Sequence, residues 1–132
     1  PGFAPLPYSR YTGWRLYEQP VQTVDATTGN PVPGASVQVV ADEIRESEDR
    51  RGRTDASGSL KLACSAPGWY MPAGFPFEDG QDYVELESIC LEVDADGYGP
   101  VTIKLDEHFG KPRWDFQRDG PMPDVVVKLR RE

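Results

Sequence analysis

The sequence predicts an all-β fold in which two sheets of about seven short strands pack as a sandwich and carry long aromatic loops. Three observations predict it. The 132-residue chain contains 13 glycines and 13 prolines, which favours many short elements joined by turns. Several segments alternate apolar and polar residues with the two-residue period of half-buried strands. Three turns also share one chemistry, with an aspartate at the start and a glycine at the end.

The first thirteen residues are expected to form an extended arm. Residues 1–11, PGFAPLPYSRY, carry three prolines and three aromatic residues, a composition that suits a chain without internal hydrogen bonds. We expect Phe3, Tyr8 and Tyr11 to anchor this arm, either on its own domain or on another subunit. Residues 14–132 then form a single sandwich domain, long enough to bury roughly two-thirds of its unfolded surface.

The first half of the domain predicts three strand regions. Residues 14–25 read as one or two strands, with Pro20 marking an edge or a break. Residues 36–41 alternate cleanly, and residues 59–64 place apolar side chains on one side. The stretch from 41 to 53 is rich in acids and arginines, so we expect a solvated connection with at most a short helical turn. Nearby acids neutralise its pair Arg50 and Arg51, which argues against an anion site.

The second half alternates two aromatic loops with further strands. Residues 68–80, GWYMPAGFPFEDG, are expected to form a long loop. Residues 83–93 are the longest strand candidate, with a bulge near Ser88 because the apolar phase slips there. Residues 101–105 and 125–129 are two more strands, separated by a second loop, DEHFGKPRWDFQRDGPMPD.

The three shared turns begin at Asp25 (DATTG), Asp55 (DASG) and Asp94 (DADG). An aspartate at the first position accepts backbone hydrogen bonds, and a glycine at the end accepts positive φ. Calcium binding is the alternative, but an EF-hand loop needs acids at its first, third and fifth positions before the glycine. DADGYGPVT lacks that pattern, so turn chemistry is the preferred interpretation.

These corner motifs resemble those of a known family. VQTVDATTGNPVPGASVQV followed by RTDASGSLKL resembles the carboxypeptidase regulatory-like domains of the transthyretin-like (prealbumin) sandwiches, whose form is also Ig-like. VDADGYGPVTIKL looks like the later strand pair of that family, and DVVVKLRRE like its closing strand. The match covers about half the chain. Because the matching residues are corner residues, the resemblance implies a fold rather than a chemistry.

Enzymes of similar fold depend on particular residues, most of which this chain lacks. GRTDASGSLKLACSAPGWY is similar to a segment of the intradiol ring-cleaving dioxygenases, which would place Tyr70 at an iron-ligand tyrosine. That ferric site needs two tyrosines and two histidines, whereas His108 is the only histidine here. The transthyretin-like hydroxyisourate hydrolases close with Tyr-Arg-Gly-Ser, which this chain lacks. An adhesin-type isopeptide is also disfavoured, because the sole asparagine, Asn30, lies in the corner turn.

Charge and cysteine content limit the partners. The net charge is −8, with 22 acids against 14 bases, which disfavours nucleic acid and anionic membranes. The sequence has no apolar run long enough to span a bilayer. Cys64 and Cys90 are predicted to form a disulfide, with two separate thiols in a reducing compartment as the alternative. Because the sequence starts at Pro1, we expect a removed signal peptide and an extracellular or periplasmic location.

The sequence therefore predicts a non-catalytic accessory subunit, without cofactor or metal, that binds other protein subunits of a larger assembly. One alternative is a carbohydrate-binding module that uses aromatic rings as stacking platforms. The other is a degenerate dioxygenase-like metalloprotein, completed by another chain, to which Tyr70 and His108 would contribute. The predicted contact residues are the aromatic residues of the arm and of the two loops: Phe3, Tyr8, Tyr11, Trp69, Tyr70, Phe75, Phe77, Trp114 and Phe116.

Overall fold

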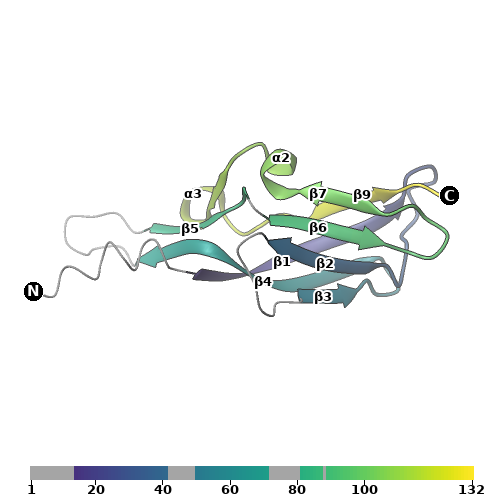
Figure 1. Cartoon of the computed structure of the whole chain (residues 1–132), viewed down its shortest axis with the longest axis horizontal. Helices are drawn as coiled ribbons and strands as arrows, with labels where there is room; N and C mark the ends of the chain where they lie inside the picture. The colour runs from purple at the N-terminus through teal and green to yellow at the C-terminus, as the bar shows by residue number, and fades with distance from the viewer. Residues whose placement is uncertain (1–13, 42–49, 72–80, 88) are drawn as a thin grey trace, which may run out of the picture.

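The computed structural model describes residues 14–41, 50–71, 81–87 and 89–132, which fold into two layers of β-sheet (Figure 1). One sheet has five strands in the order β8-β5-β4-β1-β9, and the other has four in the order β3-β2-β6-β7. Neighbouring strands are antiparallel except β1 and β9, which are parallel. The predicted two-sheet, mostly β architecture is therefore confirmed.

The strands are β1 (Trp14–Asp25), β2 (Ser36–Ala41), β3 (Arg50–Arg53), β4 (Ser59–Met71), β5 (Gln81–Glu85), β6 (Ile89–Asp94), β7 (Val101–Lys104), β8 (Arg113–Asp115) and β9 (Val125–Leu129). Two short helices, α2 (Leu105–Phe109) and α3 (Phe116–Asp119), follow β7 and β8. The described part of the chain thus contains nine strands rather than about seven.

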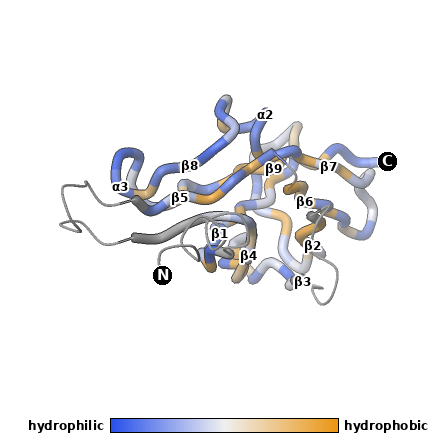
Figure 2. Tube along the Cα trace, turned by 60° about the vertical axis from the view of Figure 1, so that its left-hand side comes forward, coloured by the Kyte–Doolittle hydropathy of each residue, from blue (hydrophilic) through white to orange (hydrophobic). Residues whose placement is uncertain are grey.

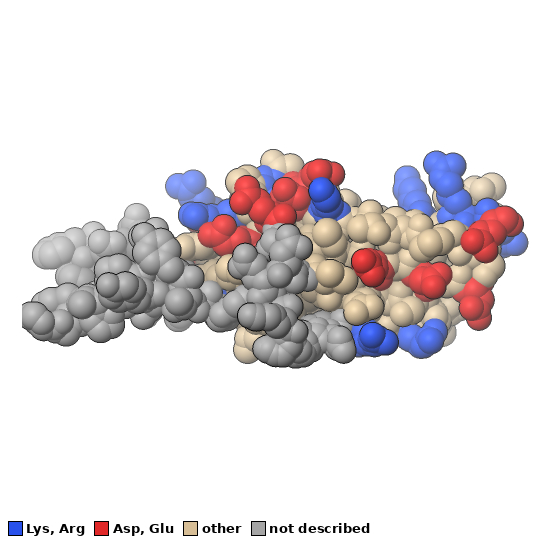
Figure 3. Space-filling model, viewed as in Figure 1, with Lys and Arg blue, Asp and Glu red and all other residues tan. Residues whose placement is uncertain are grey.

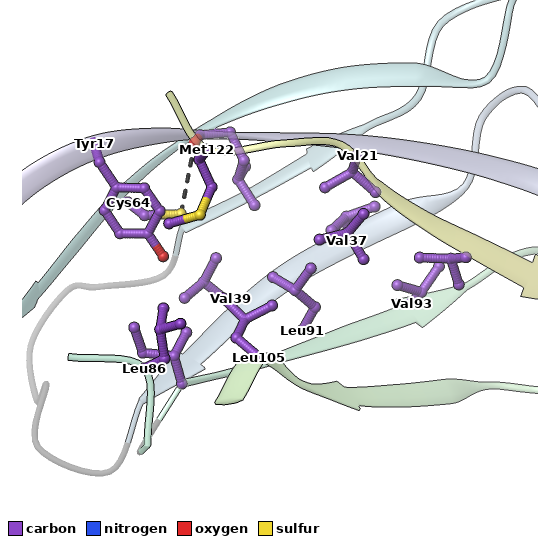
Figure 4. Packing of buried hydrophobic residues seen from close by; sticks show 14 of the residues in the cluster. Tyr17, Val21, Val37, Val39, Cys64, Leu86, Leu91, Val93, Leu105 and Met122 are labelled. Carbon is purple, nitrogen blue, oxygen red and sulfur yellow. Dashed lines mark hydrogen bonds between the residues drawn. The ribbon is translucent and has the colours of Figure 1, made fainter. Parts of the chain in front are cut away.

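The core lies between the two sheets. Alternate residues of the facing strands are fully buried, among them Val21, Val37, Leu91 and Val127. Figure 2 shows the corresponding hydrophobic stretches along β2, β6 and β9. In Figure 4, Tyr17 and Met122 lie on one side of the core and point toward residues of the opposite layer. Burial of each large apolar side chain contributes roughly 2 kcal/mol to stability. The burial of these alternating side chains is therefore the main force that holds the two sheets together.

The proline-rich corner after β1 folds back on that strand. Pro31 forms an isolated bridge with Val24, and the Val32 N–H donates to the Thr23 carbonyl at 2.9 Å. Val32 and Ala35 are buried at the entry to β2. The fixed φ of proline disfavours helix here and sets this geometry, so the predicted role of the corner is confirmed.

Two of the three aspartate turns have the predicted chemistry. Asp25 Oδ1 accepts the N–H groups of Thr27 and Thr28, and Asp55 Oδ1 accepts those of Ser57 and Ser59. The glycines that end all three turns have positive φ. The prediction for Asp94 is wrong, because within the described residues its carboxylate makes no hydrogen bond to the turn that follows.

Three predicted boundaries are corrected by the structure. The segment 50–53 is the strand β3, not part of a loop, and β4 continues through residues 68–71, which the sequence predicts to be the start of the first aromatic loop. The predicted long strand at 83–93 is two strands, β5 and β6, which belong to different sheets. The slip in apolar phase marks the crossing between the layers rather than a bulge; Ser88 itself lies outside the described residues.

The predicted disulfide is not formed. Cys64 is 1% exposed on the inner face of β4 in the five-stranded sheet. Cys90 belongs to β6 in the other sheet, where the neighbouring Ile89 and Leu91 are the residues buried in the core. Alternate residues of a strand point to opposite faces, so Cys90 turns away from the layer that holds Cys64. A bond would need a different register of β6.

The described residues include no helix that is both long and apolar enough to cross a bilayer. Export of the domain stays a prediction.

Candidate functional site

Charged and aromatic side chains gather at one end of the five-stranded sheet. Figure 1 shows β5, α3 and the adjoining ends of β1 and β4 extending beyond the four-stranded sheet. At this end the guanidinium of Arg15 forms a two-point contact with the Asp82 carboxylate, with an Nη2–Oδ2 distance of 3.1 Å. The two side chains are 27% and 14% exposed. Such bidentate pairs hold both partners in a fixed geometry.

A glycine makes this ion pair possible. Arg15 lies on β1 and Asp82 on β5, and β4 runs between these two strands. A Cβ atom at Gly68 of β4 would lie 2.7 Å from the Arg15 Cβ and 2.4 Å from the Tyr83 carbonyl oxygen. The missing side chain therefore leaves the space through which Arg15 crosses β4 to reach Asp82.

Helix α3 places an aromatic ring against Arg15. Asp115 caps the helix, since its side chain accepts the N–H groups of Gln117 and Arg118. The first helical residue, Phe116, then lies with its ring centroid 4.7 Å from the Arg15 guanidinium carbon and 6.2 Å from the Tyr17 ring. A cation at this distance from a ring is attracted by its electron-rich face.

A second arginine has the same arrangement on the neighbouring strands. Arg113 of β8 stands 4.0 Å from the Tyr83 ring centroid and pairs with Glu85 at 3.7 Å. The Arg113 side chain is half exposed, whereas Tyr83 is buried. We call Arg15, Asp82, Tyr83, Arg113 and Phe116 the cation–aromatic end.

A lysine and a tryptophan support β8 from the other side. Lys111 Nζ lies 5.0 Å from the Trp114 ring centroid and 3.1 Å from Asp119. The hydrogen bond from Lys111 lowers the pKa of Asp119, with a further contribution from the Asp115 N–H. Trp114 is 9% exposed, and its Nε1 donates to the Gly120 carbonyl at 2.9 Å. Its ring therefore stabilises the end of the sandwich.

The structure brings several predicted contact residues together. Trp69 and Tyr70, at the end of β4, pair through the backbone with Tyr83 and Asp82 of β5. Trp114, in turn, pairs with Val84 on the other side of β5. The two regions predicted as aromatic loops are thus neighbours through β5. The remaining predicted contact residues lie outside the described part of the chain: Phe3, Tyr8, Tyr11, Phe75 and Phe77.

Sequence reasoning missed Arg15, Asp82 and Arg113. The signal for Arg113 was the short PRWDF run, in which a cation alternates with aromatic and acidic residues as on a strand. Arg15 and Asp82 are 67 residues apart, and neither has a local signal.

Metal-ligating side chains are dispersed over the described segments. No group of three or more His, Cys, Asp or Glu side chains within them is placed to hold a metal ion. His108 is exposed on α2, with its ring 4.9 Å from that of Phe109. Tyr70 lies on β4, in the five-stranded sheet, whereas α2 follows β7 of the other sheet.

No family model matches the chain, and no curated protein is similar to it in sequence. Solved structures do share its fold. The Bacillus anthracis TIE protein matches with a TM-score of 0.51 at 15% identity, over 89% of this chain and 17% of its own. A variant of catechol 1,2-dioxygenase from Acinetobacter radioresistens matches with a TM-score of 0.52 at 14% identity, over 94% of this chain and 54% of its own.

At this level of identity the likeness shows the fold alone. The domain is a β-sandwich similar to part of an intradiol dioxygenase and to part of the TIE protein. It spans about half the length of the dioxygenase chain and a smaller part of the other. The resemblance to carboxypeptidase regulatory-like domains stays a prediction.

Proposed function

We propose that this domain is a non-catalytic binding module that contacts another protein through the cation–aromatic end. The observation that supports it is the pair of arginines, each stacked on an aromatic ring and each paired with a carboxylate. Arginine and aromatic residues are the types enriched at the centres of protein interfaces. Here they stand at the end of a sheet that extends beyond its partner layer.

The geometry also reduces the entropic cost of binding. A free arginine side chain loses rotamer freedom when a partner immobilises it, at about 0.5–1.5 kcal/mol. Stacking on Tyr83 and pairing with Glu85 already restrict Arg113, while half of its side chain stays accessible. Such a preorganised arginine can bind a carboxylate or carbonyl oxygen of a partner with little further ordering.

Photo-crosslinking tests this proposal. A benzophenone amino acid at Gln117, an exposed position of α3, should form an adduct with a protein of the native source. Untagged wild-type domain should compete with that adduct, whereas an Arg113→Ala domain should compete at least about tenfold less well, because truncating a hot-spot arginine costs about 2 kcal/mol or more.

Lys128→Ala is the matched control, since Lys128 is an exposed cation on β9. It should compete as well as wild type. Equal competition by Arg113→Ala, or an adduct that wild-type domain does not reduce, would contradict the proposed contact surface.

A dioxygenase-like metalloprotein is the second candidate, favoured by the fold likeness to catechol 1,2-dioxygenase. Tyr70 and His108 would be its contribution to a site completed by another chain. We expect the purified domain, after growth with added iron, to hold less than about 0.1 iron per chain, because two ligands bind a metal weakly. Elemental analysis measures this. Stoichiometric iron that is lost in Tyr70→Phe would favour the metalloprotein instead.

The carbohydrate-binding alternative loses one of its stacking platforms, because Trp114 is buried and hydrogen-bonded. It is therefore not the function that we propose.

A further inference from the structure

The outward face of the four-stranded sheet has an ordered charge pattern. Three neighbouring strands each contribute one kind of residue: arginines from β3, uncharged polar residues from β2 and acids from β6. The register aligns them in two rows across the sheet. These rows are Arg51–Gln38–Glu92 and Arg53–Ser36–Asp94. Figure 3 shows this face, with acidic side chains along the sheet and basic ones at its lower edge. We call it the striped face.

The charges of the striped face are exposed and separated from each other. Arg51, Arg53, Glu92 and Asp94 are all exposed, and within the described residues none of them takes part in an ion pair. β3 and β6 lie on either side of β2, so the opposite charges are about 9–10 Å apart along the sheet. A groove of about 260 Å³ lies over β2, β6 and β7 and is lined by Gln38, Glu92 and Thr102 among others.

This pattern is complementary to itself under a two-fold rotation. Consider a two-fold axis that runs parallel to the strands and passes above β2. Rotation about it exchanges the β3 side of the face with the β6 side, and it leaves the position of each row along the strands unchanged. It therefore brings β3 of one copy over β6 of the other. Arg51 then meets Glu92 of the second copy, and Arg53 meets Asp94. We propose that the striped face binds a second copy of this chain in this arrangement, as an isologous dimer.

The side chains on the axis fit close approach. β2 contributes Ser36 and Gln38, and two residues further along it contributes Val40, which is 36% exposed. In the dimer each of these meets its own equivalent, so Val40 adds an apolar contact. Packed sheets lie about 10 Å apart, a gap that an arginine and a glutamate reaching from opposite sides can span.

The dimer should be weak. The face has only four short strands, which places it below the area of a standard protein interface, and the net charge of −8 opposes association. We expect a dissociation constant on the order of 100 µM. Sedimentation equilibrium over a concentration series up to about 1 mM is the measurement.

Charge exchange tests the proposed pairing. Arg51→Glu and Glu92→Arg should each weaken self-association at least about tenfold, because each places like charges opposite one another. The double variant Arg51→Glu/Glu92→Arg should associate again as wild type does. An equimolar mixture of the two single variants should also form dimers, because the glutamate at 51 of one meets the arginine at 92 of the other.

Lys61→Glu and Glu18→Arg are the matched controls, since they change net charge by the same amounts on the outward face of the other sheet. Both should associate as wild type, and all variants should keep the wild-type melting temperature because the substituted residues are exposed. The proposal is overturned by a monomeric wild-type chain at the highest concentration, by singles that associate normally, or by a mixture that stays monomeric.

Discussion

Gly58→Ala should lower the free energy of unfolding by about 3 kcal/mol. Gly58 has φ 77°, a conformation that costs a residue with a side chain about 1–2 kcal/mol. An added Cβ would also lie 2.6 Å from the Thr23 carbonyl oxygen and 3.1 Å from the Pro31 Cβ. The oxygen belongs to the backbone of β1 and cannot rotate away. The variant must therefore move the DASG turn off β1, and with it the hydrogen bond from the Thr23 N–H to the Gly58 carbonyl at 2.8 Å.

Gly97→Ala separates the two contributions. Gly97 has φ 83° in a turn of similar sequence, but nothing lies within 4 Å of its added Cβ. We expect this variant to lose only about 1 kcal/mol, the cost of the backbone conformation alone. Urea unfolding of both variants measures the difference. Equal losses of unfolding free energy in the two variants would show that the contact between the DASG turn and β1 does not contribute to stability.

The part of the fold that the sequence predicts is the part built on local chemistry. Asp25, Asp55 and the proline corner act through neighbours a few residues away, so their roles can be read from short motifs. The alternation of apolar and polar residues in β2 and β9 directly indicates which face of each strand is buried. The positive φ of Gly58 can also be predicted, from the DASG motif. The close packing of Gly58 on the Thr23 carbonyl cannot, because it joins two separate parts of the chain.

Strand β3 could not be predicted because its pattern lacks apolar residues. Gly52 faces inward next to the buried Val37, and the Leu60 side chain fills the space above it, 3.1 Å from where a Cβ would be. Each flanking arginine lies at the sheet edge, where charge is favoured over apolar residues. From its sequence alone, such a strand cannot be distinguished from a solvated loop; its pairing with β2 identifies it.

The candidate site could not be predicted for a different reason. Arg15 and Asp82 become neighbours only because β1 and β5 both flank β4, and residues 81–82 lie between the predicted loop at 68–80 and the predicted strand at 83–93. The sequence identifies the aromatic residues as candidate contact residues, but which of them are buried depends on how α3 packs. Trp114 pairs with the buried Val84 and is itself buried, whereas Phe116 is left half-buried beneath Arg15.

Asp25→Asn should lower the melting temperature by roughly 10 °C at pH 7. The Asp25 side chain is 4% exposed, and its carboxylate joins its own turn to two distant segments. Oδ1 accepts the Thr27 and Thr28 N–H groups, while Oδ2 accepts the Tyr98 hydroxyl at 2.9 Å and Arg131 Nε at 3.0 Å. The neutral side chain of asparagine would lack the negative charge that strengthens these four hydrogen bonds. Its NH2 group cannot accept a hydrogen bond, so at least one of the four donors would lose its acceptor.

The loss should depend on pH in a defined direction. The hydrogen bond from the Thr28 N–H, followed by those from Arg131 and Tyr98, holds the pKa of Asp25 far below its ordinary value of 3.8. The stabilisation is therefore complete at pH values at least about one unit above 3.8, where Asp25 of the unfolded chain is also ionised. Below that pH the unfolded chain gains a proton that the folded chain resists, so the contribution decreases. The difference in stability between wild type and Asp25→Asn should thus stay constant from pH 7 to about pH 5, begin to decrease near pH 4 and continue to decrease below pH 3.

Asp96→Asn is the matched control for this prediction. Asp96 is exposed in the turn that precedes Tyr98, and within the described residues its side chain makes no hydrogen bond or ion pair. The same chemical change there should shift the melting temperature by less than about 2 °C at any pH. Urea unfolding of the three proteins at pH 7, 5, 4 and 3 makes the comparison. A gap between wild type and Asp25→Asn that stayed constant down to pH 3 would mean that the buried carboxylate stabilises the corner by its shape rather than by its charge.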